Sequence, residues 1–178
     1  MHNIGLKKGE LEIMDYKDDY PTIFEEEKQE LIRLYGDKIF QIEHVGSTSI
    51  KGIKSKPIID IMIQTNDLDD FILFTETNIE GDIYTVKKEP TASGDYLIRK
   101  EEDGKVKAFI HVYKTGDINA ENLLLFRDYL NSHEEERKRY DDLKADLIIK
   151  YKENRPKYTL GKNNFINEVL EKAKRKID

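Results

Sequence analysis

The chain has 178 residues, a length that suits one domain with its own hydrophobic core. Its formal net charge of -6 disfavours a protein that coats nucleic acid, because neutralising many phosphates requires a surplus of lysine and arginine. The chain contains no cysteine, which excludes disulfides, thiolate metal sites and a cysteine nucleophile.

The sequence shows no sign of a leader segment, a membrane span or a linker between domains. Residues 1–12 mix charged side chains with isolated apolar ones and lack the apolar core of a signal peptide. No apolar run is long enough to span a membrane, and no repeat or low-complexity linker divides the sequence. We therefore expect a single domain over residues 1–178, in the cytoplasm and without membrane contact.

A helix is predicted first, because Asp19 and Pro21 are residues that open helices and Gly36 is one that ends them. Two strands are predicted next, over residues 38–45 and 57–63. The second strand is almost continuously apolar, which is typical of a central strand that is covered on both faces.

The rest of the chain predicts a hairpin followed by helices. The remaining elements are a helix capped by Asn66 or Asp67 and ending near Gly81, a strand at 83–87, a hairpin of 96–99 and 106–113, helices beyond Asn119, and a last helix over 162–176. This order predicts an α/β or α+β fold: a mixed β-sheet packed with helices, and a helical C-terminal third.

The turn after the first strand carries the strongest chemical signal. Gly46 lets the backbone approach a phosphate, Ser47 and Thr48 offer donors, and Lys56 adds positive charge. A carboxylate inside an apolar strand, here Asp60, is costly unless it is hydrogen bonded, paired or bound to a cation. These residues predict a phosphate site in which Asp60 holds a divalent metal, Mg²⁺ or another. The alternative is an ordinary turn with solvated lysines.

Three further side chains have two interpretations each. His111, in an apolar strand, is either a satisfied core residue or a second metal ligand opposite Asp60. His44 either hydrogen bonds a ligand oxygen or orients the turn that follows it. Arg127 either pairs with Asp128 or clamps a phosphate in a bidentate manner.

These motifs resemble a known family. The run from His44 to Ser49, followed by Lys56 to Asp60, is similar to the signature of the GrpB family. Further similar segments are Phe126-Arg127-Asp128-Tyr129-Leu130, Tyr140 with Leu143-Lys144, and Lys162 before Phe165-Ile166. The resemblance extends from about Tyr20 to Ile177.

The resemblance implies a fold similar to the polymerase-beta-type nucleotidyltransferases, whose motif joins a Gly-Ser turn to a strand with two carboxylates. Gly46 and Ser47 match the turn, and Asp60 matches the first carboxylate. The second position holds Met62, which cannot ligate Mg²⁺ and weakens a two-metal mechanism. The strand with His111 is the counterpart of the one that carries a third carboxylate.

The function expected from the sequence is that of a nucleotidyltransferase-like protein that binds a nucleotide or another phosphate-containing small molecule. The alternative is a catalytically inactive binding or regulatory module of the same fold. An RNA-modifying transferase is disfavoured by the acidic balance. The site residues expected are Asp60 and His111 for catalysis and metal binding, and His44, Gly46, Ser47, Thr48, Lys56 and Arg127 for ligand binding.

Overall fold

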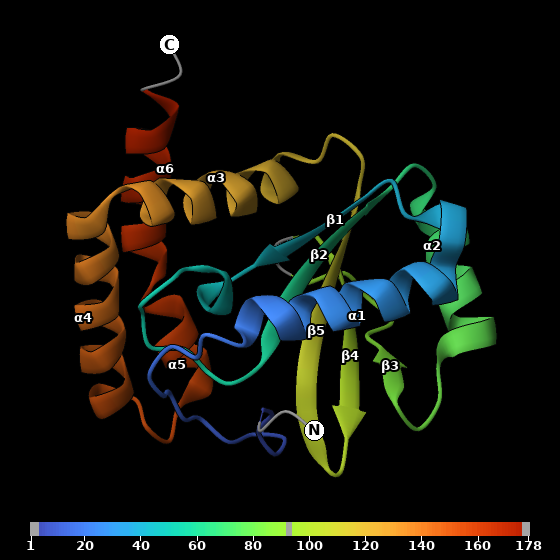
Figure 1. The fold of residues 1–178 in the computed structure, drawn as a ribbon, viewed down its shortest axis with the longest axis horizontal. Helices are drawn as coiled ribbons and strands as arrows, with labels where there is room; N and C mark the ends of the chain where they lie inside the picture. Colours follow the sequence, from blue (N-terminus) through green and yellow to red (C-terminus); the bar gives the residue numbers. More distant parts are fainter. Residues whose placement is uncertain (1–3, 92–93, 176–178) are drawn as a thin grey trace.

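A computed structural model describes residues 4–91 and 94–175 of the chain (Figure 1). Its centre is a five-stranded sheet in the order β1-β2-β5-β4-β3. The strands are β1 (Gln41–Val45), β2 (Ile59–Thr65), β3 (Tyr84–Val86), β4 (Tyr96–Glu102) and β5 (Lys105–Lys114). β2 and β5 are parallel and the other neighbours are antiparallel, so the predicted mixed sheet is confirmed.

The helices are α1 (Tyr20–Tyr35), α2 (Leu68–Phe74), α3 (Ile118–Ser132), α4 (Glu134–Lys150), α5 (Arg155–Leu160) and α6 (Asn163–Lys174). Figure 1 shows α1 crossing one face of the sheet, whereas α3 to α6 gather at one end of the molecule, as predicted for the C-terminal third. Within the described ranges, no helix is both long and apolar enough to cross a bilayer. The cytoplasmic location stays a prediction.

Several boundaries of helices and strands in the structure differ from the predicted ones. The first helix begins at Tyr20 and Gly36 is its C-cap, as predicted, but residues 36–38 form a 3-10 turn that delays β1. The hairpin turn is shorter than predicted, because Asp103 and Gly104 both adopt positive φ and close it with two residues. The short helix α5 was not predicted, and Lys176 of the predicted last helix lies outside the described residues.

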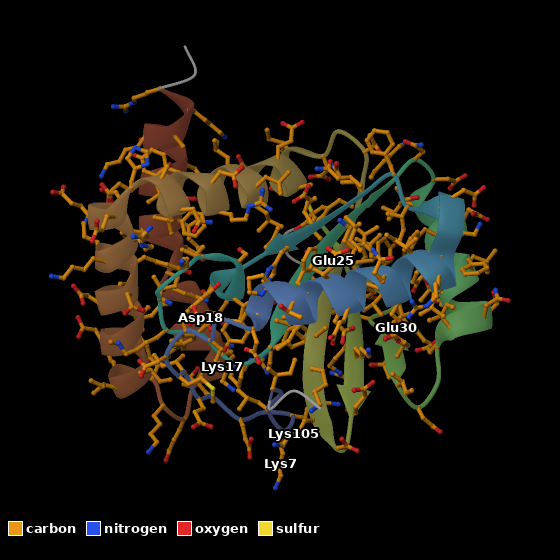
Figure 2. All side chains as sticks on the ribbon, viewed as in Figure 1. Lys7, Lys17, Asp18, Glu25, Glu30 and Lys105 are labelled. Atoms are coloured by element: carbon orange, nitrogen blue, oxygen red, sulfur yellow. The ribbon has the colours of Figure 1, made fainter. Side chains whose placement is uncertain are left out.

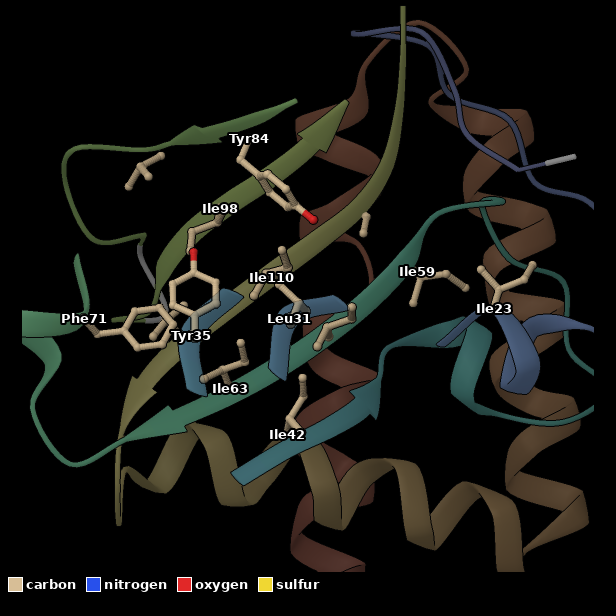
Figure 3. Packing of buried hydrophobic residues seen from close by; sticks show 14 of the residues in the cluster. Ile23, Leu31, Tyr35, Ile42, Ile59, Ile63, Phe71, Tyr84, Ile98 and Ile110 are labelled. Atoms are coloured by element: carbon tan, nitrogen blue, oxygen red, sulfur yellow. The ribbon is translucent and has the colours of Figure 1, made fainter. Parts of the chain in front are cut away.

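One face of the sheet packs against α1 and α2 (Figure 3). Leu31 and Tyr35 of α1 meet Ile59 and Ile63 of β2, and all four side chains are buried. Because side chains alternate along a strand, Asp60 and Met62 must point to the other face. The α1 side of β2 is therefore lined by Ile59, Ile61 and Ile63.

A buried ion cluster ties α1 to β4. Lys100 is 3% exposed, and its ammonium lies 2.8 Å from a carboxylate oxygen of Glu30 and 2.9 Å from one of Glu27. Glu30, which is labelled in Figure 2, also accepts a hydrogen bond from the hydroxyl of Tyr84. A buried ammonium is tolerated only when it is paired in this way, so the cluster fixes the helix on the sheet.

The opposite face of the sheet is covered by α3. Val45, Met62 and Tyr113 form a buried cluster with Ala120 of that helix. Beyond the end of β1, the segment after the turn is held by the C-terminal helices, because Ile50 and Ile53 pack into a second core. That core is completed by Tyr129, Leu130, Tyr140, Phe165, Val169 and Ala173.

Candidate functional site

A cavity of about 330 Å³ opens where the sheet face that carries Asp60 meets the C-terminal helices. The turn after β1, the loop before β2, the sheet and the region of α5 supply its walls. The lining residues are Ser47 and Thr48 from the turn after β1, Ser55, Lys56 and Ile58 from the loop before β2, Asp60, Leu97, Phe109 and His111 from the sheet, and Arg155, Tyr158, Thr159 and Lys162 from α5 and its end.

Gly46 and Asp60 are in close contact at one wall of the cavity. Gly46 has φ 70° and ψ -171°, a region essentially restricted to glycine. A methyl group there would lie 2.8 Å from the Cβ of Asp60. The glycine is therefore required both by its backbone conformation and by the carboxylate beneath it.

The carboxylate of Asp60 faces the cavity. Its side chain is 31% exposed, and its Oδ1 lies 3.6 Å from Nε2 of His111. Asp60 is thus partly exposed and not sealed in the core, which explains how an apolar strand tolerates it. The structure brings Asp60 and His111 together with Ser47, Thr48 and Lys56, as the sequence suggested.

The ring nitrogen of His111 that does not face Asp60 is hydrogen bonded to a buried carboxylate, which the sequence did not indicate. Asp95 is 1% exposed, and its Oδ2 lies 2.8 Å from Nδ1 of His111. Its other oxygen accepts a hydrogen bond from Thr91. Burial lowers the pKa of His111, but Asp60 and Asp95 outweigh it and raise that pKa to about 9. The imidazole is therefore charged at neutral pH.

Three cations border the cavity without a carboxylate partner. Within residues 4–91 and 94–175, no carboxylate oxygen lies within 4.0 Å of the charged nitrogens of Lys56, Arg155 or Lys162. The two ammonium groups lie 5.4 Å and 5.0 Å from the ring centre of Tyr158. The guanidinium of Arg155 lies 5.6 Å from the ring centre of Phe109. Aromatic rings thus hold these cations in place.

The two lysines are perturbed by this crowding. Burial, together with repulsion by Arg155 and Lys162, lowers the pKa of Lys56 to about 8. Burial also lowers the pKa of Lys162, with Arg155 adding to the effect. Like charges that are held together in a partly dry cavity cost free energy, which an anion would recover on binding.

His44 does not line the cavity. Its ring stacks on Phe24 of α1 at 4.8 Å, on the other face of the sheet, and its Nε2 lies 2.9 Å from Oγ1 of Thr48. Burial lowers the pKa of His44 to about 4, so the ring is neutral. Of its two interpretations, the geometry agrees with the orientation of the turn.

Arg127 also lies outside the cavity lining. One terminal nitrogen donates to Oε2 of Glu43 and to the carbonyl of His44, both at 2.9 Å, and Nε donates to Asp128 at 2.7 Å. This guanidinium fastens β1 to α3. The geometry agrees with the structural interpretation of this residue.

Helix α4 fixes the loop that leads to Lys56. Asp141 accepts a hydrogen bond from the backbone N–H of Lys54 at 2.6 Å, and the buried ammonium of Lys144 donates to the carbonyl of Lys54. Tyr140 of the same helix packs in the second core with Ile50 and Ile53. The segment after the turn and the lysine loop are therefore positioned by the same helix.

The functional residues missed from the sequence include Arg155 and Tyr158, which line the cavity, and Asp95, which holds His111. Asp95 sits in an irregular loop, where no periodicity marks a buried position. A signal for α5 did exist, since Asn154 caps the helix and Pro156 follows in its first turn. Recognising it would have placed Arg155 and Tyr158 on one short helix.

The donor set does not fit Mg²⁺, which prefers an octahedron of oxygen ligands. Among the described residues no group of three or more histidine, cysteine, aspartate or glutamate side chains is arranged to hold a metal. Asp60 is the cavity's one carboxylate, and Met62, at the position of the second, is fully buried. A divalent metal on Asp60 and His111 stays a prediction of the sequence.

The buried His44 predicts an acid-sensitive fold. The His44 side chain takes up a proton near pH 6.5 in the unfolded chain but only near pH 4 in the folded chain. The free energy of unfolding therefore falls as the pH drops between these two values. Wild-type protein should lose about 2–3 kcal/mol relative to His44→Gln between pH 7 and pH 4 in urea unfolding. His133→Gln is the control, and a constant difference between wild type and His44→Gln would contradict the prediction.

Taken together, the sheet and cavity define a small mixed α/β protein with a cluster of cations at one end of its sheet. The family model described as GrpB protein matches residues 10–172. The chain belongs to the GrpB family, which confirms the resemblance seen in its sequence.

Curated relatives and a solved structure agree with this assignment. The chain is 34% identical over 168 residues to the UPF0157 protein YqkA of Bacillus subtilis, an alignment that covers 94% of the chain but 48% of YqkA. It thus spans about half the length of that relative. It is 29% identical to the glutamate-rich protein GrpB of Alkalihalophilus pseudofirmus, covering 94% of the chain and 98% of the relative. The crystal structure of conserved protein GrpB from Enterococcus faecalis superposes with a TM-score of 0.82 at 27% identity, covering 93% and 99% of the two chains.

Proposed function

We propose that this chain binds a phosphate-containing small molecule, a nucleotide among the candidates, in the cavity beside the Gly46 turn. The observation that carries the proposal is the group of three cations, Lys56, Arg155 and Lys162, that have no carboxylate partner among the described residues. The whole chain has a net charge of -6, so this local excess of positive charge runs against its composition. Phosphate oxygens are the natural partners of such a cluster.

The remaining walls suit the rest of such a ligand. Ser47, in the turn that follows Gly46, adds a hydroxyl group to the cavity wall. Leu97 and Phe109 supply an apolar surface for an organic moiety. A few polar groups on a partly apolar wall are the usual composition of a small-molecule site.

Binding without turnover is favoured over nucleotidyl transfer. Asp60 beside a Gly-Ser turn agrees with the transferase motif, which makes transfer the second candidate. Met62, however, is fully buried under α3, so no second carboxylate can be presented at that position. The binding or regulatory module is therefore the form of the function that these side chains support best.

Titration calorimetry with inorganic phosphate, AMP and ATP tests the proposal. Arg155→Gln and Lys162→Gln are each expected to weaken binding about tenfold or more, because each removes a charged donor. Lys157→Gln, an exposed lysine of the same short helix that does not line the cavity, is the matched control and should bind as wild type does. Equal affinities in all variants would sink the proposal.

A transfer assay separates the two candidates. Incubating the protein with labelled ATP should give no nucleotidylated product if the chain is a binding module. Accumulation of such a product in wild-type protein, but not in Arg155→Gln, would establish transfer instead.

A further inference from the structure

We infer that Asp60 acts as a counter-charge to the cavity's cations and not as a metal ligand, so that the phosphate ligand is bound without a divalent ion. This inference rests on the proposed function and specifies how the same site neutralises its ligand. It departs from the transferase motif, in which the matching carboxylate holds a metal.

The surroundings of Asp60 are cationic on several sides. Nε2 of His111 lies 3.6 Å from its Oδ1. Burial lowers the pKa of Lys56 and Lys162, and attraction to Asp60 opposes that effect in both. The carboxylate therefore already balances part of the positive charge of the empty cavity.

The neighbours of Asp60 also leave few ligands for a metal ion. Nδ1 of His111 is hydrogen bonded to Asp95, whose own carboxylate is buried and does not line the cavity. Met62 belongs to the core against α3. Asp60 and, when His111 is neutral, one imidazole nitrogen are then the only strong donors at this point of the described structure, which is too few for Mg²⁺.

A counter-charge and a metal ligand predict opposite effects when the carboxylate is removed. A bound phosphate and the carboxylate of Asp60 compete for the same lysines, so Asp60 weakens anion binding. A metal ligand would strengthen it, since the ion bridges the protein and the phosphate. The sign of the change in affinity therefore decides between the two roles.

The experiment is calorimetric titration of inorganic phosphate and pyrophosphate into wild-type protein and Asp60→Asn at pH 7, once with EDTA and once with excess Mg²⁺. Asparagine has nearly the shape of aspartate, so the packing against Gly46 is retained. We expect wild-type protein to bind in EDTA and Asp60→Asn to bind about threefold to tenfold more tightly. Loss of binding in Asp60→Asn, with the fold intact by thermal melting, would overturn the inference.

Titration of Mn²⁺ alone into wild-type protein provides an independent second measurement. We expect no Asp60-dependent manganese site. A stoichiometric manganese site that disappears in folded Asp60→Asn would overturn the inference, whatever the phosphate titration gives. If wild-type protein binds no phosphate compound, the proposed function fails, and the manganese titration still decides the role of Asp60.

Discussion

Gly46→Ala is expected to lower the free energy of unfolding by about 4 kcal/mol and to abolish anion binding in the cavity. Two costs combine at this position. The backbone has φ 70° and ψ -171°, which strains any residue with a side chain. The added methyl group would also meet the Cβ and Cγ of Asp60 at 2.8 Å, so the turn or β2 must shift. Urea unfolding and phosphate titration measure the two effects.

A matched glycine separates the steric cost from the backbone cost. Gly52 has φ 84°, and a Cβ built there meets nothing within 4 Å. Gly52→Ala should therefore cost only about 1–2 kcal/mol and leave anion binding unchanged. If the two substitutions have equal effects on stability and binding, the contact between Gly46 and Asp60 is not what the structure indicates.

Met62→Asp is expected to destabilise the protein by about 4 kcal/mol or more without creating a transferase. Met62 is fully buried among Val45, Tyr113 and Ala120, and none of these offers a charged partner. The new carboxylate would have to remain in the core, where its charged neighbour on β5, His111, is already paired with Asp95, or displace α3. Urea unfolding should show the loss, and labelled ATP should give no product.

Met62→Leu is the control for this substitution, because it conserves volume and should cost less than about 1.5 kcal/mol. A stable Met62→Asp protein that gained Mg²⁺-dependent nucleotidyl transfer would contradict both the packing argument and the preference for a binding module. The experiment therefore distinguishes two reasons for the missing second carboxylate. Either Met62 alone prevents a metal site, or this face of β2 is part of the core and cannot hold a carboxylate at all.

The expected effects differ in origin. Asp60 and Gly46 act through their mutual contact, and Met62 acts through the cover that α3 provides. Arg155 and Lys162 act through charge, and both lie in or next to a helix that the sequence did not suggest. The proposed ligand site thus depends on the packing of the C-terminal helices against the end of the sheet.

The sequence by itself determined the local elements of this protein. Asp19, Pro21 and Gly36 set the limits of α1 through backbone preferences, and the apolar run of β2 placed it in the interior of the sheet. The same run singled out Asp60, because a lone charge is conspicuous among buried apolar residues. The family resemblance also followed from short motifs.

Only the tertiary structure decided which side chains share the cavity. Alternation along β1 turned His44 toward α1, and the pairing of Arg127 with Glu43 withdrew its guanidinium from the site. Asp95 and Arg155 reached the site from regions far from the turn. Local propensities act over a few residues, whereas a binding site is formed by contacts between distant segments, which no local pattern encodes.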